Sequence, residues 1–199
     1  AGLDETERPG RARVLLLQGP PGSGRRHLAR WLGLRVQEED LVDAVLDAHH
    51  DDAHEGGLAP AVRRCLRLDR ATAPELGASA RRALAALPLP WEGLDDALVS
   101  WLTPASVAPT WPEARLLHGL LHGLSRGRPV LLLVQDLERS AATLRAIAAL
   151  LRRQHLSPVP VLIVATTRPG DVPGLPQPGP DSPVTAVRVG PIPTATVAG

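Results

Sequence analysis

Continuous runs of apolar residues mark the chain at three places, and each run predicts a β-strand. The runs lie at 13–18, 130–135 and 159–165. A strand that is covered on one face alternates apolar and polar residues, whereas a continuous run is typical of a strand buried on both faces. The stretch 184–189 alternates and predicts a further strand. We expect 13–18 to be a central strand with 130–135 beside it.

Apolar residues between these runs recur at a spacing of three and four, which predicts amphipathic helices. Strands that alternate with helices predict a three-layer α/β fold, a mostly parallel sheet with helices on both faces. In this scheme residues 13–199 form the core domain, 58–124 a helical insertion and 1–12 a linker. The predicted helices are 25–37, 58–68, 74–87, 91–102, 113–124 and a segment that ends at Arg153.

The segment 41–48 allows two interpretations. Its alternating residues favour a strand that ends near His49, while Glu38 to Asp40 would allow the preceding helix to continue. We favour the strand. The polar residues 49–54 that follow lie too close together for the spaced ligand pairs of a zinc site, so we interpret them as a solvated loop.

The segment that joins the first strand to the first helix is rich in glycine. Strand, glycine turn and helix are the context of a phosphate-binding loop, in which backbone N–H groups and the helix N-terminus face an anion. In the pattern GxxxxGK[ST], the lysine position holds Arg25 and the hydroxyl position holds Arg26. We therefore predict a polyphosphate cradle without its magnesium-binding hydroxyl; the alternative is a purely structural turn. The segment reads Gly19, Pro20, Pro21, Gly22, Ser23, Gly24, Arg25 and Arg26.

Polar residues follow two of the other predicted strands at the point where each strand ends. Gln135 and Asp136 follow one strand, and residues 166–168 follow the next. Because ligands of parallel α/β sheets bind at the carboxyl ends of strands, we expect both segments to lie beside the glycine-rich loop.

These segments, in this order, resemble the P-loop ATPases of the AAA-like and STAND group. More narrowly, the chain resembles the ATPase module of multidomain bacterial serine/threonine protein kinases. The resemblance implies that residues 19–24 hold the phosphates of ATP or ADP and that Arg25 stands for the phosphate-binding lysine. It implies that Gln135 replaces the magnesium-linked aspartate, that Asp136 is the catalytic acidic residue, and that Arg168 lies near the γ-phosphate sensor position. It also implies a helical lid, which these residues do not include.

The departures from the family pattern predict weak nucleotide binding and little or no hydrolysis. Arginine is a larger and more planar cation than lysine, and magnesium loses two protein ligands at once. Our first hypothesis is a degenerate P-loop domain with a regulatory or scaffolding role in a larger signalling protein. A working ATPase switch and a P-loop kinase that acts on a small molecule are the alternatives.

Composition narrows the expected partners. The net charge is +1, which gives no electrostatic reason to expect a nucleic-acid or membrane partner. There is one cysteine, Cys65, which we interpret as a packing thiol, and no apolar run is long enough to span a membrane. We expect a cytoplasmic protein, part of a longer or processed chain, whose partners are a nucleotide, other domains of the same chain and other proteins. No metal site is predicted: His118 and His122 lack the glutamate of HExxH, so we interpret them as a polar helix edge.

Overall fold

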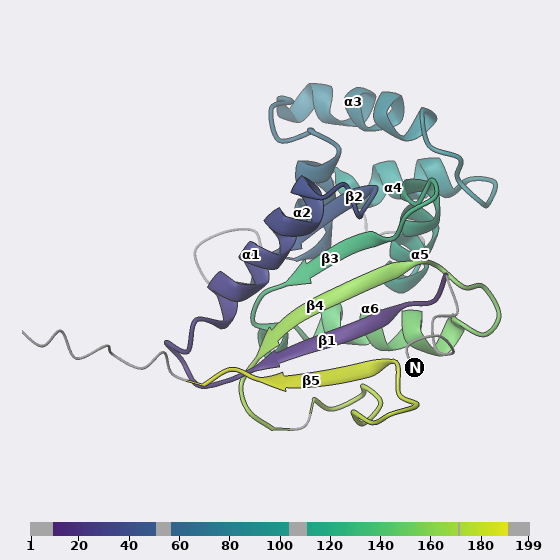
Figure 1. The fold of residues 1–199 in the computed structure, drawn as a ribbon. Helices are drawn as coiled ribbons and strands as arrows, with labels where there is room; N and C mark the ends of the chain where they lie inside the picture. Colours follow the sequence, from purple (N-terminus) through teal and green to yellow (C-terminus); the bar gives the residue numbers. More distant parts are fainter. Residues whose placement is uncertain (1–9, 51–56, 104–110, 171, 191–199) are drawn as a thin grey trace, which may run out of the picture.

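The computed structural model describes residues 10–50, 57–103, 111–170 and 172–190. Residues 1–9 of the predicted linker 1–12, and 51–54 of the polar segment 49–54, therefore lie outside the described residues. Ala12, at the end of the predicted linker, is buried in the core. The described chain forms a sheet flanked by helices (Figure 1).

All pairs of neighbouring strands in the sheet are parallel. The sheet has five strands in the order β2-β3-β4-β1-β5. The predicted α/β fold with a mostly parallel sheet is confirmed, and 44–48 is a strand, as favoured. The strands are β1 (Arg13–Gln18), β2 (Ala44–Ala48), β3 (Val130–Val134), β4 (Val161–Thr167) and β5 (Val184–Arg188).

The predicted neighbour of β1 is wrong. β4 lies between β1 and β3, because Leu162 pairs with Arg13 on one side and with Leu131 on the other. β1 remains an interior strand, since β5 pairs with its other edge. A continuous apolar run reports burial on both faces, but it carries no information about which strand lies alongside. Which strand pairs with β1 depends on the crossover between β3 and β4. This crossover places β4 on the side of β3 that faces β1.

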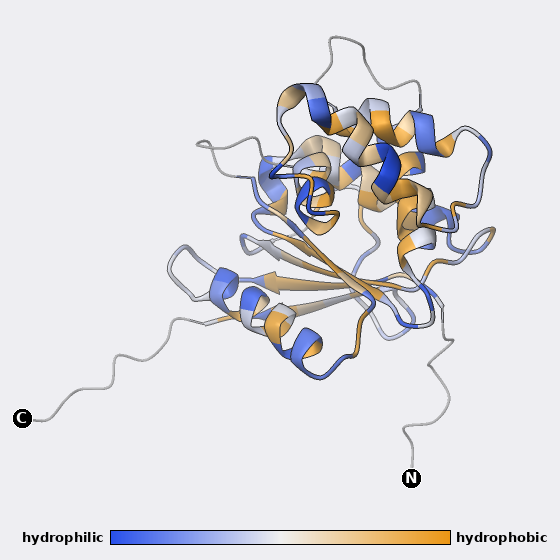
Figure 2. Ribbon diagram, turned by 90° about the horizontal axis from the view of Figure 1, so that it is seen from above, coloured by the Kyte–Doolittle hydropathy of each residue, from blue (hydrophilic) through white to orange (hydrophobic). Residues whose placement is uncertain are grey.

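Helices cover both faces of the sheet, as predicted (Figure 2). One helix, α1, packs on one face over Leu17, Leu131, Leu133 and Val164. The other helices lie on the opposite side, where a larger apolar cluster joins them to the sheet. The helices are α1 (Arg25–Glu38), α2 (Leu58–Cys65), α3 (Ala73–Ala85), α4 (Leu94–Leu102), α5 (Glu113–Leu124) and α6 (Ala141–Arg153), with a short 3₁₀ turn η1 (Leu137–Arg139).

Backbone chemistry explains three of the differences between predicted and observed boundaries. Helix α4 begins three residues later than predicted because Gly93, at φ 72°, caps it in the left-handed region. Helix α2 ends before Arg67, whose φ of 57° is incompatible with a continued helix. Strand β4 begins after Pro160, which has no N–H to donate to a strand partner.

His118 is buried, so the prediction of a polar helix edge at His118 and His122 is wrong for His118. The ring of His118 packs edge-on against Trp91, with 5.4 Å between the ring centroids. Nearby, the guanidinium of Arg115 lies 3.8 Å from the ring centroid of Trp111. Burial lowers the pKa of His118 below its ordinary value. Trp91, which packs against this histidine, lies 27 positions earlier in the sequence, so the spacing of the two histidines could not reveal the contact.

Candidate functional site

Three segments that are distant in sequence meet at the carboxyl edge of the sheet. They enclose a hollow of about 460 Å³. Its walls are residues 21–27 of the loop and the start of α1, then Asp136, Glu138 and Arg139 after β3, and Arg168 after β4. The structure thus brings together most of the predicted site residues.

The loop after β1 bends through glycines that no other residue could replace without strain. Gly22 and Gly24 have φ of 80° and 83°, in the left-handed region, and Gly24 is the N-cap of α1. Gly19 is required for a different reason: a Cβ there would lie 2.4 Å from the carbonyl oxygen of Val189. The Gly19 N–H donates to the Thr167 carbonyl over 3.3 Å, which ties the loop to β4. The N-terminus of α1 therefore faces the hollow.

Ser23 is a buried polar residue inside this loop. It is 2% exposed, and its Oγ has no hydrogen-bond partner among the described atoms. Because a buried hydroxyl without a partner is costly, most native structures provide one. Ser23 also lines the hollow, so it is available to interact with a ligand held there.

Arg25, at the lysine position of the pattern, is tied to the end of β4. Its side chain is buried, and its Nη1 donates to the Thr167 carbonyl. This hydrogen bond holds a charged group against the wall of the hollow, of which Arg25 is part.

Arg26, at the hydroxyl position, forms an ion pair with Asp136. Its Nη2 donates to Oδ2 of the carboxylate. The Asp136 side chain is 9% exposed, whereas that of Arg26 is 55% exposed. The pair thus joins the start of α1 directly to the end of β3, across the edge of the sheet where the phosphate chemistry is expected.

The backbone holds Asp136 in place for this contact. Its φ of 52° is in the left-handed region, where it caps η1. Its N–H donates to Oγ1 of Thr166 over 2.9 Å, a bond between the ends of β3 and β4. The predicted catalytic carboxylate is therefore in the site, but with Arg26 as its partner.

Gln135 faces β2 and not the loop. Its Nε2 donates to Oδ1 of Asp47 over 3.2 Å, and Oδ2 of Asp47 lies 3.3 Å from Nε2 of His49. His50, beside them, is partly buried, which lowers its pKa, while the charge of Asp136 acts in the opposite direction. Gln135 does not line the hollow that the loop encloses, unlike the other predicted binding residues from 21 to 26.

Arg168 reaches the hollow from the end of β4, as expected. Its Nε lies 3.6 Å from Oε1 of Glu138, and its side chain is 73% exposed. Glu138 and Arg139, which line the same hollow, were not among the predicted site residues. They lie two and three residues after Asp136, so their position just after a buried strand was the signal that could have identified them.

The residues present do not fit a magnesium ion. Mg²⁺ requires oxygen ligands in octahedral geometry. Here the guanidinium of Arg26 stands at the hydroxyl position, and the amide of Gln135 stands where the magnesium-linked aspartate was expected. The nearby carboxylate of Asp136 is engaged by Arg26. Within the part of the chain that the structure describes, no three His, Cys, Asp or Glu side chains are grouped so as to hold a metal.

Comparisons with known proteins identify no family for this chain. No protein-family model and no curated protein matches the sequence. Among solved structures, the chain is similar to a structure of Drosophila ORC bound to DNA. The identity is 16% and the TM-score 0.42, over 90% of this chain. It is also similar to one of C. elegans PCH-2, at 15% identity and a TM-score of 0.37 over 90% of this chain.

The chain spans 37% and 36% of the lengths of these two structures. A likeness at this level assigns neither a function nor a partner. Among the described residues, no helix has the length and apolarity needed to cross a bilayer.

Proposed function

We propose that this chain is a degenerate P-loop domain that binds ATP or ADP weakly and hydrolyses it slowly or not at all. The observation that carries the proposal is the loop: left-handed glycines turn the backbone around the N-terminus of α1, beside a hollow with several arginines. Unpaired N–H groups and the helix dipole at such a terminus favour phosphate.

The expected role is regulation or scaffolding within a larger bacterial signalling protein. Only the sequence resemblance supports a serine/threonine kinase as the parent protein. A domain that binds nucleotide without turning it over has two states, occupied and empty, and a neighbouring domain of the same chain or another protein could respond to the difference.

The contact of Arg26 with Asp136 disfavours the alternative of a working ATPase switch. Phosphoryl transfer depends on positioning and on electrostatic stabilisation around the phosphates. A carboxylate already paired with an arginine is a poor base for water, and the loss of two metal ligands removes further stabilisation. No described feature favours a small-molecule kinase.

Isothermal titration calorimetry with ATP and with ADP tests the proposal, and phosphate release measures turnover. In the variant Gly24→Ala, a side chain is forced into the left-handed N-cap of α1, and we expect nucleotide binding to be lost. Gly93→Ala is the matched control, because Gly93 is the left-handed N-cap of α4, away from the hollow. Equal affinity of both folded variants for nucleotide, or the absence of any binding by the unchanged chain, would refute the proposal.

A further inference from the structure

The place where a P-loop holds its metal contains a positive charge that belongs to the protein. The guanidinium of Arg26 stands where the pattern has the metal-binding hydroxyl, and it already bonds to Asp136. The carboxylate is only 9% exposed, so this pair is shielded from solvent on the acidic side. A second cation at the same place would face the guanidinium directly.

The hollow as a whole is also positive. Arg25, Arg26, Arg139 and Arg168 line it, against the two carboxylates of Asp136 and Glu138. The excess of arginines attracts a polyphosphate, and more strongly the more negative charge it carries. The hydroxyl of Ser23 offers it a further hydrogen-bonding group. The metal-free form of a nucleotide carries more negative charge than its magnesium complex. The charge of the hollow therefore favours the free form.

We propose that Arg26 acts as a tethered cation in place of magnesium, so that the hollow binds a metal-free nucleoside polyphosphate in preference to its magnesium complex. This inference rests on the proposed nucleotide-binding function and deepens it. In P-loop proteins that use the metal, magnesium strengthens binding. Here added magnesium weakens it, because Mg²⁺ withdraws charge from the phosphates and is itself repelled by Arg26.

Calorimetry with ATP tests the inference under two conditions, with EDTA and with excess Mg²⁺. We expect the dissociation constant to rise about fivefold or more on adding the metal, the lower end of ordinary coupling between two ligands. In Arg26→Ser this preference is lost, and the two dissociation constants become equal or change order. Arg168→Ser removes the same charge from the same hollow, so it weakens both forms but keeps their order.

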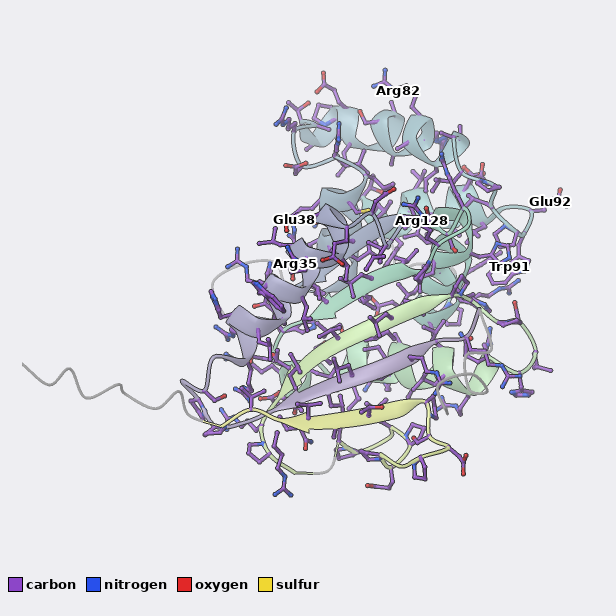
Figure 3. All side chains as sticks on the ribbon, viewed as in Figure 1. Arg35, Glu38, Arg82, Trp91, Glu92 and Arg128 are labelled. Atoms are coloured by element: carbon purple, nitrogen blue, oxygen red, sulfur yellow. The ribbon has the colours of Figure 1, made fainter. Side chains whose placement is uncertain are left out.

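Arg35→Ser is the control on the same helix. Arg35 pairs with Glu38 and Glu39 toward the C-terminal end of α1. Figure 3 labels Arg35 and Glu38 on this helix, and Arg35 does not line the hollow. We expect this variant to behave like the unchanged chain. Circular dichroism confirms that each variant is folded.

The outcomes distinguish a failure of the inference about Arg26 from a failure of nucleotide binding itself. If the unchanged chain binds ATP more tightly with magnesium, the inference about Arg26 is wrong, while nucleotide binding stands. If Arg26→Ser keeps the preference for metal-free ATP, Arg26 is not the tethered cation. If the folded, unchanged chain binds ATP under neither condition, the proposed function itself fails, and the inference fails with it.

Discussion

Replacing Gly19 by alanine tests whether the loop after β1 is as tightly seated as the structure shows. A Cβ at this position would lie 2.4 Å from the carbonyl oxygen of Val189 and 2.6 Å from Oγ of Ser23. One of these atoms is backbone and cannot rotate away. The loop or the segment after β5 must therefore shift, and the shift weakens the contacts that hold the loop on the sheet.

The size of the effect follows from the cost of adding a carbon where there is no room. Overpacking of this kind costs about 1–3 kcal/mol. Any Gly→Ala change also stabilises through the unfolded chain, by about 0.4–1 kcal/mol. Gly179→Ala isolates that contribution, because a Cβ at Gly179 meets nothing within 4 Å and its φ is not in the left-handed region.

The quantity to measure is thus the difference between the two variants. For a domain of this size, about 1–3 kcal/mol corresponds to a difference in melting temperature of about 2–12 °C. Thermal unfolding by circular dichroism gives the temperatures, and urea unfolding gives the free energies. If Gly19→Ala and Gly179→Ala unfold at the same temperature and urea concentration, the close packing of the loop against Val189 is wrong.

Three further predictions concern the site and the core. The triple variant Arg25→Lys, Arg26→Ser, Gln135→Asp restores the lysine, the hydroxyl and the carboxylate together; we expect calorimetry to show tighter Mg-ATP binding, and unchanged affinity would count against a decayed cradle. Because burial lowers the pKa of His118, the unfolded chain takes up a proton more readily than the folded one, so the free energy of unfolding should fall as pH drops below 6.5. Urea unfolding at several pH values should show a flatter dependence in His118→Leu, and an equally steep one would refute this. The Oε1 of buried Gln154 accepts from two backbone N–H groups over 2.9 and 3.1 Å. Gln154→Leu should cost about 2–6 kcal/mol in urea unfolding, and a loss below about 1 kcal/mol would contradict the role of these bonds.

Elements with a strong local signal could be predicted from the sequence. The apolar run of β3 required burial on both faces, and the structure leaves all five of its residues buried. The glycines of the loop were predicted from their spacing, and two of them are in the left-handed region. In both cases the property that determines the structure, burial for β3 and backbone freedom for the loop, depends on residues that are close in sequence.

Contacts between distant segments could not be predicted in the same way. Arg26 and Asp136 were each singled out, but their ion pair joins residues that are 110 positions apart. It depends on the lengths of β1, α1 and β3 and on the direction of one flexible side chain. The bond of Gln135 to Asp47 likewise depends on β2 lying next to β3, which no local pattern specifies.

The position of β4 between β3 and β1 has a consequence for how the chain folds during synthesis. Arg13 at the start of β1 pairs with Leu162, whereas Ala44 of β2 pairs with Val130. β1 leaves the ribosome well before β4, so its pairing with β4 must wait until that later strand has been made. Such distant pairing slows folding and prolongs the time in which unpaired strand edges can associate with other chains. The nascent glycine-rich loop gains the strand end that anchors it only when Thr167 has emerged.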